Sequence, residues 1–337
     1  MSSGRVIEVR APECGLVAFI VLDSQVLGPA AGGVRTLPYP SESDALADAR
    51  RLARAMTLKC AISGLPAGGG KAVVMDHPAL NREEAFRRLG EAVQRLGGAF
   101  RTAGDAGTTE ADLRTMAKVC DYVHLDGGAL SAAVARGLLS CLTAACDVRD
   151  DITWPDTTVA IQGCGAIGGA VAKMLNQQGA ALTLTDINTS RLQGLCRELD
   201  ARAVAPDAFF SMDAAICSPC ALGGVVTASV ARTLSARIVC GAANNIMGDD
   251  DAEAILFHRG ITLVPDVIAS AGAVVAGIAQ TVMGLEDPSP LIDRLGETTK
   301  EVLKACRDDG ELPSRVVTAF VTERLGDAIV ALPAPRS

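Results

Sequence analysis

The sequence is poor in aromatic residues and has no long run of positive charge. Only 3% of its 337 residues are Phe, Trp or Tyr, whereas 49% are hydrophobic and Gly is abundant. We therefore expect a core of small aliphatic side chains packed in α/β layers. The formal net charge is -8 and Lys and Arg are not clustered. This argues against binding to nucleic acid or to an anionic membrane surface.

Cysteine and histidine are present, but not in the spacings that disulfide frameworks or metal sites require. The 11 cysteines are an odd number and are scattered through apolar segments. This usage predicts reduced, mostly buried thiols in a cytoplasmic protein. Cys217 and Cys220 form a C-x-x-C pair, but no second pair or histidine spacing completes a zinc site. We predict no metal.

Neither a leader nor a membrane span is predicted. Residues 1–10 already carry charges and lack the apolar centre of a signal peptide. The stretch 267–285 has no charge, but it is rich in Gly, Ala and Ser. A membrane-spanning helix usually needs a stronger run of about 20 apolar residues. We expect a buried, Ala-rich helix there.

The order of predicted elements indicates two α/β domains. In the first half we expect strands and helices in alternation, with Ser43 and Thr109 as candidate helix caps: strands 15–22, 72–75 and 100–102, and helices 41–55, 81–96 and 109–119. In the second half we expect strands at 156–162, 181–186, 214–217, 238–240 and 261–264, with a helix at 168–178. Such alternation favours a parallel, doubly wound sheet. We place the domains at residues 1–130 and 131–311, joined by a helix over 131–146.

One glycine motif indicates the cofactor. The run Gly163-Cys164-Gly165-Ala166-Ile167-Gly168 matches G-x-G-x-x-G, follows a predicted strand and opens a predicted helix. Its glycines would form the tight turn, admit the pyrophosphate, and let helix and strand pack closely. Asp186 ends the next strand, where it would accept hydrogen bonds from the ribose and repel a 2′-phosphate. The motif therefore predicts NAD rather than NADP; a purely structural glycine turn is the alternative.

Two lysines and one aspartate are candidates for the chemistry. Lys71 follows three glycines and precedes a predicted strand, so its amine could point into a cleft where desolvation lowers its pKa. Lys59 could remain charged and hold a substrate carboxylate. Asp105 follows a strand and is flanked by glycines. Surface lysines and a turn aspartate are the alternative interpretation.

In several ordered segments the sequence resembles the Glu/Leu/Phe/Val amino-acid dehydrogenases, and the leucine dehydrogenase branch in particular. The resemblance covers nearly the whole chain. The segments that carry it are 28–35, 56–71 with its GGGK run, 102–109, 163–168, 185–188, the PCALGG-type segment 218–224, 241–245 and 265–266.

The resemblance implies a fold and an activity. The fold is an N-terminal α/β catalytic domain and a Rossmann NAD-binding domain with a cleft between them, the chain end at 312–337 packing back on the first domain. The activity is reversible, NAD-dependent oxidative deamination of an L-amino acid to a 2-oxo acid and ammonia. Relatives assemble as homo-oligomers, so at least a dimer is implied.

The same resemblance implies a role for individual residues. Lys59 would bind the substrate carboxylate, Lys71 would be the general acid and base that activates water, and Asp105 would carry protons to and from the substrate nitrogen. The backbone at Gly32 and Gly33 would line the substrate pocket. The implied cofactor contacts beyond the glycine motif and Asp186 are Ile187, Ala243, Asn244 and Asn245.

Three departures from the family pattern lie near the implied substrate. Ala31 stands where leucine dehydrogenases have a leucine, Ser270 where an asparagine is usual, and Val134 where a threonine contacts the nicotinamide side. We therefore expect the catalytic residues to be retained and the substrate to be atypical. The alternatives are an NAD-dependent imine or oxo-acid reductase and a non-catalytic, NAD-sensing relative.

Overall fold

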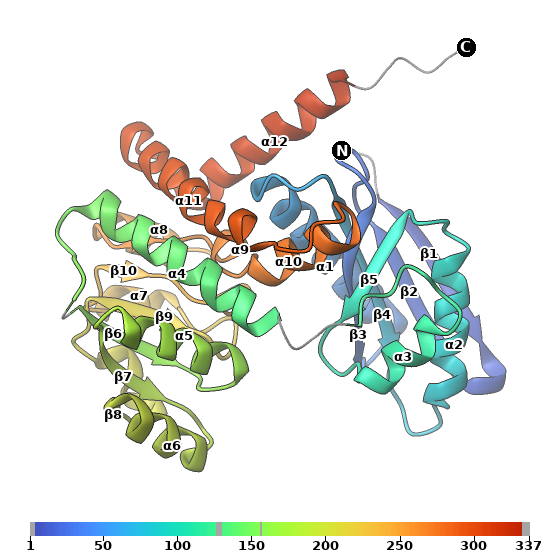
Figure 1. Ribbon diagram of the computed structural model, residues 1–337, viewed down its shortest axis with the longest axis horizontal. Coiled ribbons are helices and arrows are strands. Elements are labelled where there is room, and N and C mark those ends of the chain that lie inside the picture. Colours follow the sequence, from blue (N-terminus) through green and yellow to red (C-terminus); the bar gives the residue numbers. More distant parts are fainter. Residues whose placement is uncertain (1–3, 126–129, 156, 332–337) are drawn as a thin grey trace. The chain divides into compact units, whose positions relative to one another are not determined.

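The computed structural model describes residues 4–125, 130–155 and 157–331, which form two compact units (Figure 1). The first unit comprises residues 1–127, 277–287 and 321–337, and the second comprises residues 128–276 and 288–320. The domain ranges inferred from the sequence, with a return of 312–337 to the first domain, stay a prediction. Residues 126–129, a few positions before Val134, lie outside the described residues.

The first unit is built on a five-stranded mixed sheet in the order β1-β2-β4-β3-β5. Its strands are β1 (Arg5–Ala11), β2 (Leu16–Leu22), β3 (Ala30–Leu37), β4 (Gly68–Met75) and β5 (Phe100–Gly104). β3 runs parallel to both β4 and β5, whereas β2 is antiparallel to β1 and β4. The carboxyl ends of β3, β4 and β5 therefore point the same way, which is where polar side chains of a site are expected to gather.

Helices cover both faces of this sheet. Ala45, Ala49 and Ala53 of α1 (Glu42–Ile62) pack with Val73 of β4 on one face. α2 (Arg82–Gln94) and α3 (Glu110–Ala117) cover the other face, where their buried residues join the larger cluster that contains Val34. These three alanines belong to the buried face of α1.

The structure corrects the predicted elements around the glycines. β3 was not predicted, because Gly32 and Gly33 interrupt its apolar pattern. β4 begins at Gly68, four residues earlier than predicted, so Lys71 lies inside a strand and not ahead of one. A Cβ on Gly69 would lie 2.1 Å from the backbone nitrogen of Thr57. Glycine is therefore required at position 69, because α1 packs directly on the backbone of β4 there.

The first helix also differs from its predicted bounds. Ser41, not Ser43, is its N-cap, and the Ser41 hydroxyl accepts a hydrogen bond from the backbone nitrogen of Asp44 at 3.2 Å. The helix runs on to Ile62, well past residue 55, and therefore carries Lys59 in its last turn. Thr109 caps α3 as predicted, in a reciprocal capping box with Asp112.

The second unit contains a six-stranded, all-parallel sheet in the order β11-β10-β9-β6-β7-β8. Its strands are β6 (Thr158–Gln162), β7 (Ala181–Thr185), β8 (Arg202–Ala203), β9 (Ile216–Pro219), β10 (Ile238–Val239) and β11 (Thr262–Leu263). Numbered from β6, this is the order 6-5-4-1-2-3 of a Rossmann fold. The predicted doubly wound sheet is confirmed.

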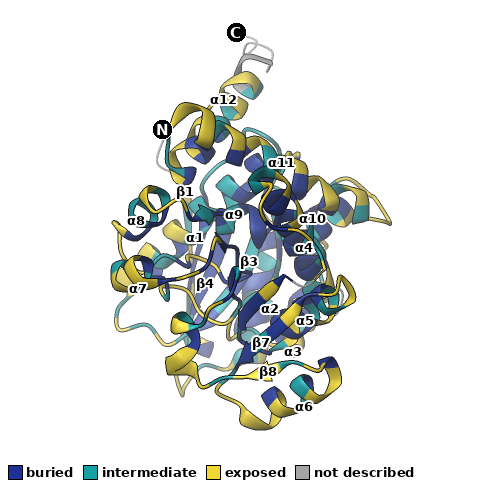
Figure 2. Cartoon of the chain, turned by 90° about the vertical axis from the view of Figure 1, so that its left-hand side faces the viewer, coloured by how far each residue is buried: buried dark blue, intermediate teal, exposed yellow. Residues whose placement is uncertain are grey.

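Helices alternate with these strands, and α6 is exposed along most of its outer surface (Figure 2). They are α4 (Leu130–Arg149), α5 (Ala166–Gln177), α6 (Thr189–Leu199), α7 (Ala228–Thr233), α8 (Ala252–His258) and α11 (Ser289–Asp309), followed by α12 (Pro313–Ala331). α4 is the one described helix that is long and apolar enough to cross a membrane. Just over half of that apolar stretch is buried, and the helix packs against α5 and α11, as a core helix does.

The predicted continuous, buried helix over 267–285 is confirmed only in part. The segment is split into α9 (Asp266–Ala269) and α10 (Gly272–Thr281), and its end beyond α10 is exposed at Met283 and Leu285. A Cβ on Gly272 would lie 2.1 Å from the carbonyl oxygen of Ala133 in α4. The close passage of two backbones therefore marks the break.

Candidate active site

The structure brings Lys71 and Asp105 into direct contact. The Lys71 amine (Nζ) lies 2.8 Å from Oδ2 of Asp105, and Lys71 is only 6% exposed. Burial lowers the pKa of Lys71 below its ordinary value, and the neighbouring carboxylate opposes but does not cancel this effect. A buried amine with a lowered pKa gives up its proton more readily than an exposed lysine, which suits it to proton exchange.

Arg35, which the sequence did not mark as a site residue, completes the contact. Its Nε lies 2.9 Å from the same Oδ2 of Asp105, and its Nη1 lies 3.2 Å from Oδ2 of Asp48 on α1. Burial alone would raise the pKa of the Asp105 carboxyl, but the charges of Lys71 and Arg35 outweigh it and lower the pKa to about 2. Asp105 is therefore a carboxylate at any working pH.

Asp48 extends this network of charged contacts beyond Arg35. It accepts hydrogen bonds from the Tyr39 hydroxyl at 2.8 Å and from Arg51 at 2.6 Å, besides its contact with Arg35. Four elements, β3, β4, α1 and the loop after β5, thus supply one connected network. Strand alternation was the available signal for Arg35: it stands two residues beyond Gly33, and the two positions share one face of β3.

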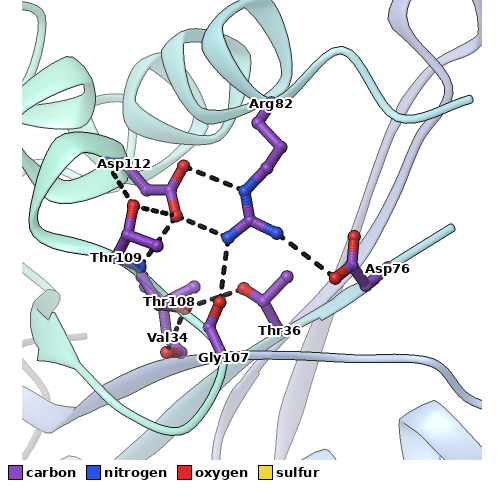
Figure 3. Close-up of polar contacts among 8 residues, drawn as sticks. All are labelled: Val34, Thr36, Asp76, Arg82, Gly107, Thr108, Thr109 and Asp112. Carbon is purple, nitrogen blue, oxygen red and sulfur yellow. Dashed lines mark hydrogen bonds and ion pairs between the residues drawn. The ribbon is translucent and has the colours of Figure 1, made fainter. Parts of the chain in front are cut away.

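A second network of hydrogen bonds and ion pairs, centred on Arg82, holds the loop that carries Asp105 (Figure 3). Arg82 of α2 donates to the carbonyl oxygen of Gly107 at 2.8 Å and forms a two-pronged pair with Asp112, at 2.5 and 3.2 Å. The Thr108 hydroxyl donates to the carbonyl oxygen of Val34 at 2.7 Å. These bonds tie the loop to α2, α3 and β3.

Two glycines let this loop lie against β3. A Cβ on Gly33 would lie 2.7 Å from the carbonyl oxygen of Gly104 and 3.0 Å from Cβ of Asp105. Gly107 has a φ of +76°, and a Cβ there would lie 1.7 Å from the carbonyl oxygen of Thr36. A side chain at either position would displace the loop and, with it, Asp105.

The other predicted substrate residues of the first unit lie on elements next to this network. Lys59 is buried in the last turn of α1. Ala31 is buried in β3, in register with Gly69 of β4, and shares the α1-facing side of the strand with Gly33. A Cβ on Gly32 would lie 1.8 Å from the carbonyl oxygen of Gly70, so close strand contact requires glycine there as well. The substrate roles of these residues stay predictions.

In the second unit the glycine motif has the geometry that a dinucleotide needs. Gly163 has a φ of +94°, which favours glycine, and a Cβ on Gly168 would lie 1.9 Å from the carbonyl oxygen of Gly163. At Gly165 a Cβ would meet nothing within 4 Å. Gly165 is also the N-cap of α5, and no side chain caps this helix. The open first turn, with Ala166 and Ile167, is therefore free to bind a pyrophosphate.

Asp186 lies at the end of β7 beside this turn. Its carboxylate accepts hydrogen bonds from the backbone nitrogen of Cys164 at 2.6 Å and from that of Asn188 at 2.7 Å. Each oxygen still has acceptor capacity for a ribose hydroxyl. Ile187 is 93% exposed, as expected of a side chain that an adenine would cover, and Arg191 stands 3.8 Å from Asp186. The residues present fit NAD.

The remaining predicted contacts cluster after β10. The Ser270 hydroxyl donates to the carbonyl oxygen of Asp266 at 2.6 Å and to Oδ1 of Asn244 at 3.3 Å. The Asp266 carboxylate accepts from the backbone nitrogen of Asn245, whose φ is +52°. Ala243 is buried beside this pair. Ser270 thus has a structural contact with Asn244, the neighbouring predicted cofactor residue.

Val134 and the C-x-x-C pair lie in the interior of the second unit. Val134 is buried in α4. Cys217 and Cys220 are free thiols, and burial raises the pKa of both. Among the described residues, no group of three His, Cys, Asp or Glu side chains could hold a metal ion.

Known proteins resemble this chain along nearly its full length. Residues 4–122 match the family model described as Glu/Leu/Phe/Val dehydrogenase, dimerisation domain, and residues 183–306 match that of glutamate/leucine/phenylalanine/valine dehydrogenase. Valine dehydrogenase of Streptomyces coelicolor is 35% identical, covering 93% of this chain and 90% of the relative; leucine dehydrogenase of Bacillus cereus is 32% identical, covering 97% and 90%. The crystal structure of L-tryptophan dehydrogenase from Nostoc punctiforme superposes with a TM-score of 0.87 at 28% identity and covers 98% of both chains.

Proposed function

The chain belongs to the Glu/Leu/Phe/Val dehydrogenase family of NAD-dependent amino-acid dehydrogenases, and from this premise we propose that it deaminates an atypical L-amino acid with Lys71 and Asp105 as catalytic residues. The observation that carries the proposal is the 2.8 Å contact between the buried Lys71 amine and the Asp105 carboxylate. A protein that only bound NAD would gain nothing from a desolvated amine paired in this way, because burying an amine is unfavourable.

The chemistry assigned to each group follows from its charge. In deamination, neutral Lys71 takes a proton from the water that attacks the imine carbon, and it returns a proton in the reverse direction. Asp105, ionised at rest, accepts a proton from the substrate ammonium before hydride transfer and returns it to the nitrogen as the C–N bond breaks, so that the proton leaves with ammonia. Lys59 remains a cation and binds the substrate carboxylate as a point charge.

The cofactor would be held in the second unit by the glycine turn and Asp186. When bound, NAD supplies the hydride acceptor for the substrate α-carbon. Gly163 forms the turn, Gly168 allows its close packing, Gly165 leaves room for the pyrophosphate, and the first turn of α5 offers its N–H groups. The Asp186 carboxylate would bind the adenosine ribose and disfavour a 2′-phosphate.

We place the substrate outside the ordinary branched-chain set. Ala31 has a small side chain on the α1-facing side of β3, where leucine would occupy more of a pocket. Ser270 is shorter than asparagine, and its hydroxyl is bonded to Asn244 and Asp266. Together these two positions favour a substrate that is larger than leucine or differently oriented.

We further propose that the enzyme is a cytoplasmic homo-oligomer, a dimer or larger. The N-terminal match is to a dimerisation domain, and β1 is an edge strand of its sheet. Edge strands leave one side of the backbone open to pairing with another chain. All eleven cysteines are free thiols and nine of them are buried, which suits a reducing compartment.

An assay of NAD reduction against a panel of L-amino acids tests the proposal. The panel includes leucine and valine together with larger aliphatic, aromatic and cyclic amino acids. We expect turnover of at least one larger substrate and slower turnover of leucine and valine. In the reverse direction, NADH oxidation with the matching 2-oxo acid should require ammonia. Reduction without ammonia, or rapid turnover of leucine, would contradict the respective part of the proposal.

A further inference from the structure

Asp105 has one carboxylate oxygen that two cations share. Lys71 Nζ lies 2.8 Å and Arg35 Nε lies 2.9 Å from the same atom, Oδ2. We propose that Arg35 is a positioning residue that fixes the Asp105 carboxylate and, by competing for this oxygen, keeps the Lys71 amine able to release its proton. The inference rests on the proposed function, because it assigns Lys71 a proton to exchange.

The strand register sets Arg35 against this pair. β3 and β4 are parallel neighbours, and Arg35 is aligned with Val73, two residues beyond Lys71. Alternation places Arg35, Lys71 and Val73 on the face of the sheet that α1 covers. On the other side of β3, Val34 is aligned with Gly104, so Arg35 stands next to Asp105 at the end of β5.

The Arg35 guanidinium is held at its other end. Asp48 of α1 accepts from Arg35 Nη1 at 3.2 Å, and Asp48 is itself fixed by Tyr39 and Arg51. The two contacts use different nitrogens of a rigid planar group. Arg35 therefore bridges α1 and the Asp105 loop, and the Asp105 side chain cannot rotate away without losing two charged hydrogen bonds.

The charges around Lys71 come from every element that packs against β4. Asp105 follows β5, Arg35 lies in β3, Asp48 and Lys59 lie in α1, and Asp23 follows β2, where it contacts Arg54 at 3.7 Å and accepts a hydrogen bond from Thr57 at 2.6 Å. Burial lowers the pKa of Lys71 most, Asp105 and Asp48 raise it, and Arg35 lowers it. The effect of Arg35 on the pKa of Lys71 is therefore opposite to that of the two carboxylates.

Removing the Arg35 charge should raise the pKa of Lys71. Asp105 and Asp48 would then stabilise the Lys71 ammonium without an opposing cation. Deamination needs neutral Lys71, so the acid side of its pH profile would move to higher pH. A shift of about one pH unit is typical for losing one charge at this range in a partly buried site. Replacing Asp48 by asparagine removes a negative charge and should move the profile the other way.

The test compares Arg35→Gln, Arg35→Lys, Asp48→Asn and the matched control Arg51→Gln. Arg51 also pairs with Asp48, but its side chain is 53% exposed and it does not contact Asp105. Two quantities are measured for each protein after thermal melting has shown that it folds. One is the pH profile of kcat/KM for the best amino acid. The other is the pH dependence of acylation of the Lys71 amine by acetic anhydride, followed by peptide mass spectrometry without substrate.

We expect both midpoints to rise by about one pH unit in Arg35→Gln, to fall in Asp48→Asn, and to stay within about 0.3 units in Arg51→Gln. Arg35→Lys should shift the midpoints less than Arg35→Gln does, because lysine restores the positive charge but cannot contact Asp105 and Asp48 through two nitrogens of one planar group. Turnover with unmoved midpoints in Arg35→Gln would overturn the inference. If Arg35→Gln does not fold, a midpoint that rises or stays fixed in Asp48→Asn overturns it instead. A shifted acylation midpoint without any amino-acid oxidation would contradict the proposed function and leave this inference standing.

Discussion

The two units build their parts of the site from different materials. In the first unit it consists of charged side chains that contact one another: Lys71, which is buried, and Asp105 and Arg35, which are partly buried. In the second unit it consists mainly of backbone: a turn with Gly163 at positive φ and an open helix N-terminus at Gly165. Binding a phosphate needs N–H groups and space, whereas moving protons needs groups whose ionisation can be adjusted.

The two parts of the site should respond differently to substitution. The glycine turn depends on the absence of side chains, so an added methyl group should weaken cofactor binding there. The charged network depends on contacts between elements, so it is damaged by any change that moves β3, β4, α1 or the loop after β5. The following variants separate these two kinds of dependence, from the largest expected effect to the smallest.

Lys71→Ala should have the largest effect. It removes the proposed general acid and base, and turnover should fall by about 10³-fold, within the range that such catalysis contributes. The dissociation constant for NAD, measured by fluorescence titration, should change less than about twofold, since the cofactor residues lie in the second unit. Lys118→Ala, an exposed lysine of the same unit, is the control. Unchanged turnover in Lys71→Ala would refute the catalytic role and favour a non-catalytic relative.

Gly33→Ala should lower turnover by about 10²-fold, because a displacement of about 1 Å in a catalytic group has an effect of this size. The new Cβ would lie 2.7 Å from the carbonyl oxygen of Gly104 and 3.0 Å from Cβ of Asp105. Gly104→Ala, at the end of the neighbouring strand β5, is the matched control, because its Cβ would meet only the flexible Leu113 side chain at 3.2 Å. The steady-state turnover of both variants is compared. An equal fall in turnover in the two would contradict a special role for Gly33.

Arg82→Gln tests whether the loop that carries Asp105 needs the hydrogen-bond network centred on Arg82 (Figure 3). The change leaves the buried Asp112 without its charged partner and should lower the free energy of unfolding by about 1–3 kcal/mol. Arg114→Gln, which breaks the exposed pair with Glu110, should lower it by less than about 0.5 kcal/mol. Urea denaturation of both proteins gives the comparison. A loss in Arg82→Gln no larger than in the control would mean that water replaces the network.

Gly165→Ala should weaken NAD binding by about tenfold while the fold stays intact, since the phosphate loses close approach to the backbone. The φ at Gly165 is -67°, and an added Cβ would meet nothing within 4 Å, so the protein itself has room for it. Gly194→Ala in α6 has the same open surroundings and serves as control. NAD titration and thermal melting distinguish the outcomes. Undiminished affinity would place the pyrophosphate elsewhere.

Much of the second unit could be predicted from local sequence. The strand, the glycine turn and the helix are consecutive, and Asp186 directly follows the next strand, so short-range order was enough to predict the glycine turn and its surroundings. The bulk pattern of alternating elements was sufficient for the doubly wound sheet. What local sequence missed here was the break at Ser270, because the cause lies in α4, where Ala133 closely approaches Gly272.

The first unit was harder to read. β3 was missed because glycines mask its alternation, and β4 was started too late for the same reason. Lys71 and Asp105 were recognised as candidates one by one. The only signal for Arg35 was the alternation of β3, a strand that was not predicted, and Asp48 and Tyr39 carry no local signal of a site. They become one network only when β3, β4 and α1 pack together.

By itself the sequence determined the class of protein, the Rossmann order of elements, the cofactor motif and the identity of two catalytic candidates. These properties follow from residues that are close in the chain, where backbone geometry and periodicity act directly. Only the tertiary structure decided which cation shares Asp105 with Lys71 and which glycines are needed for close contact. Ionisation and packing depend on neighbours 34 to 70 positions away along the chain, as for Arg35 and Asp105, and such neighbours are set by the register of the sheet.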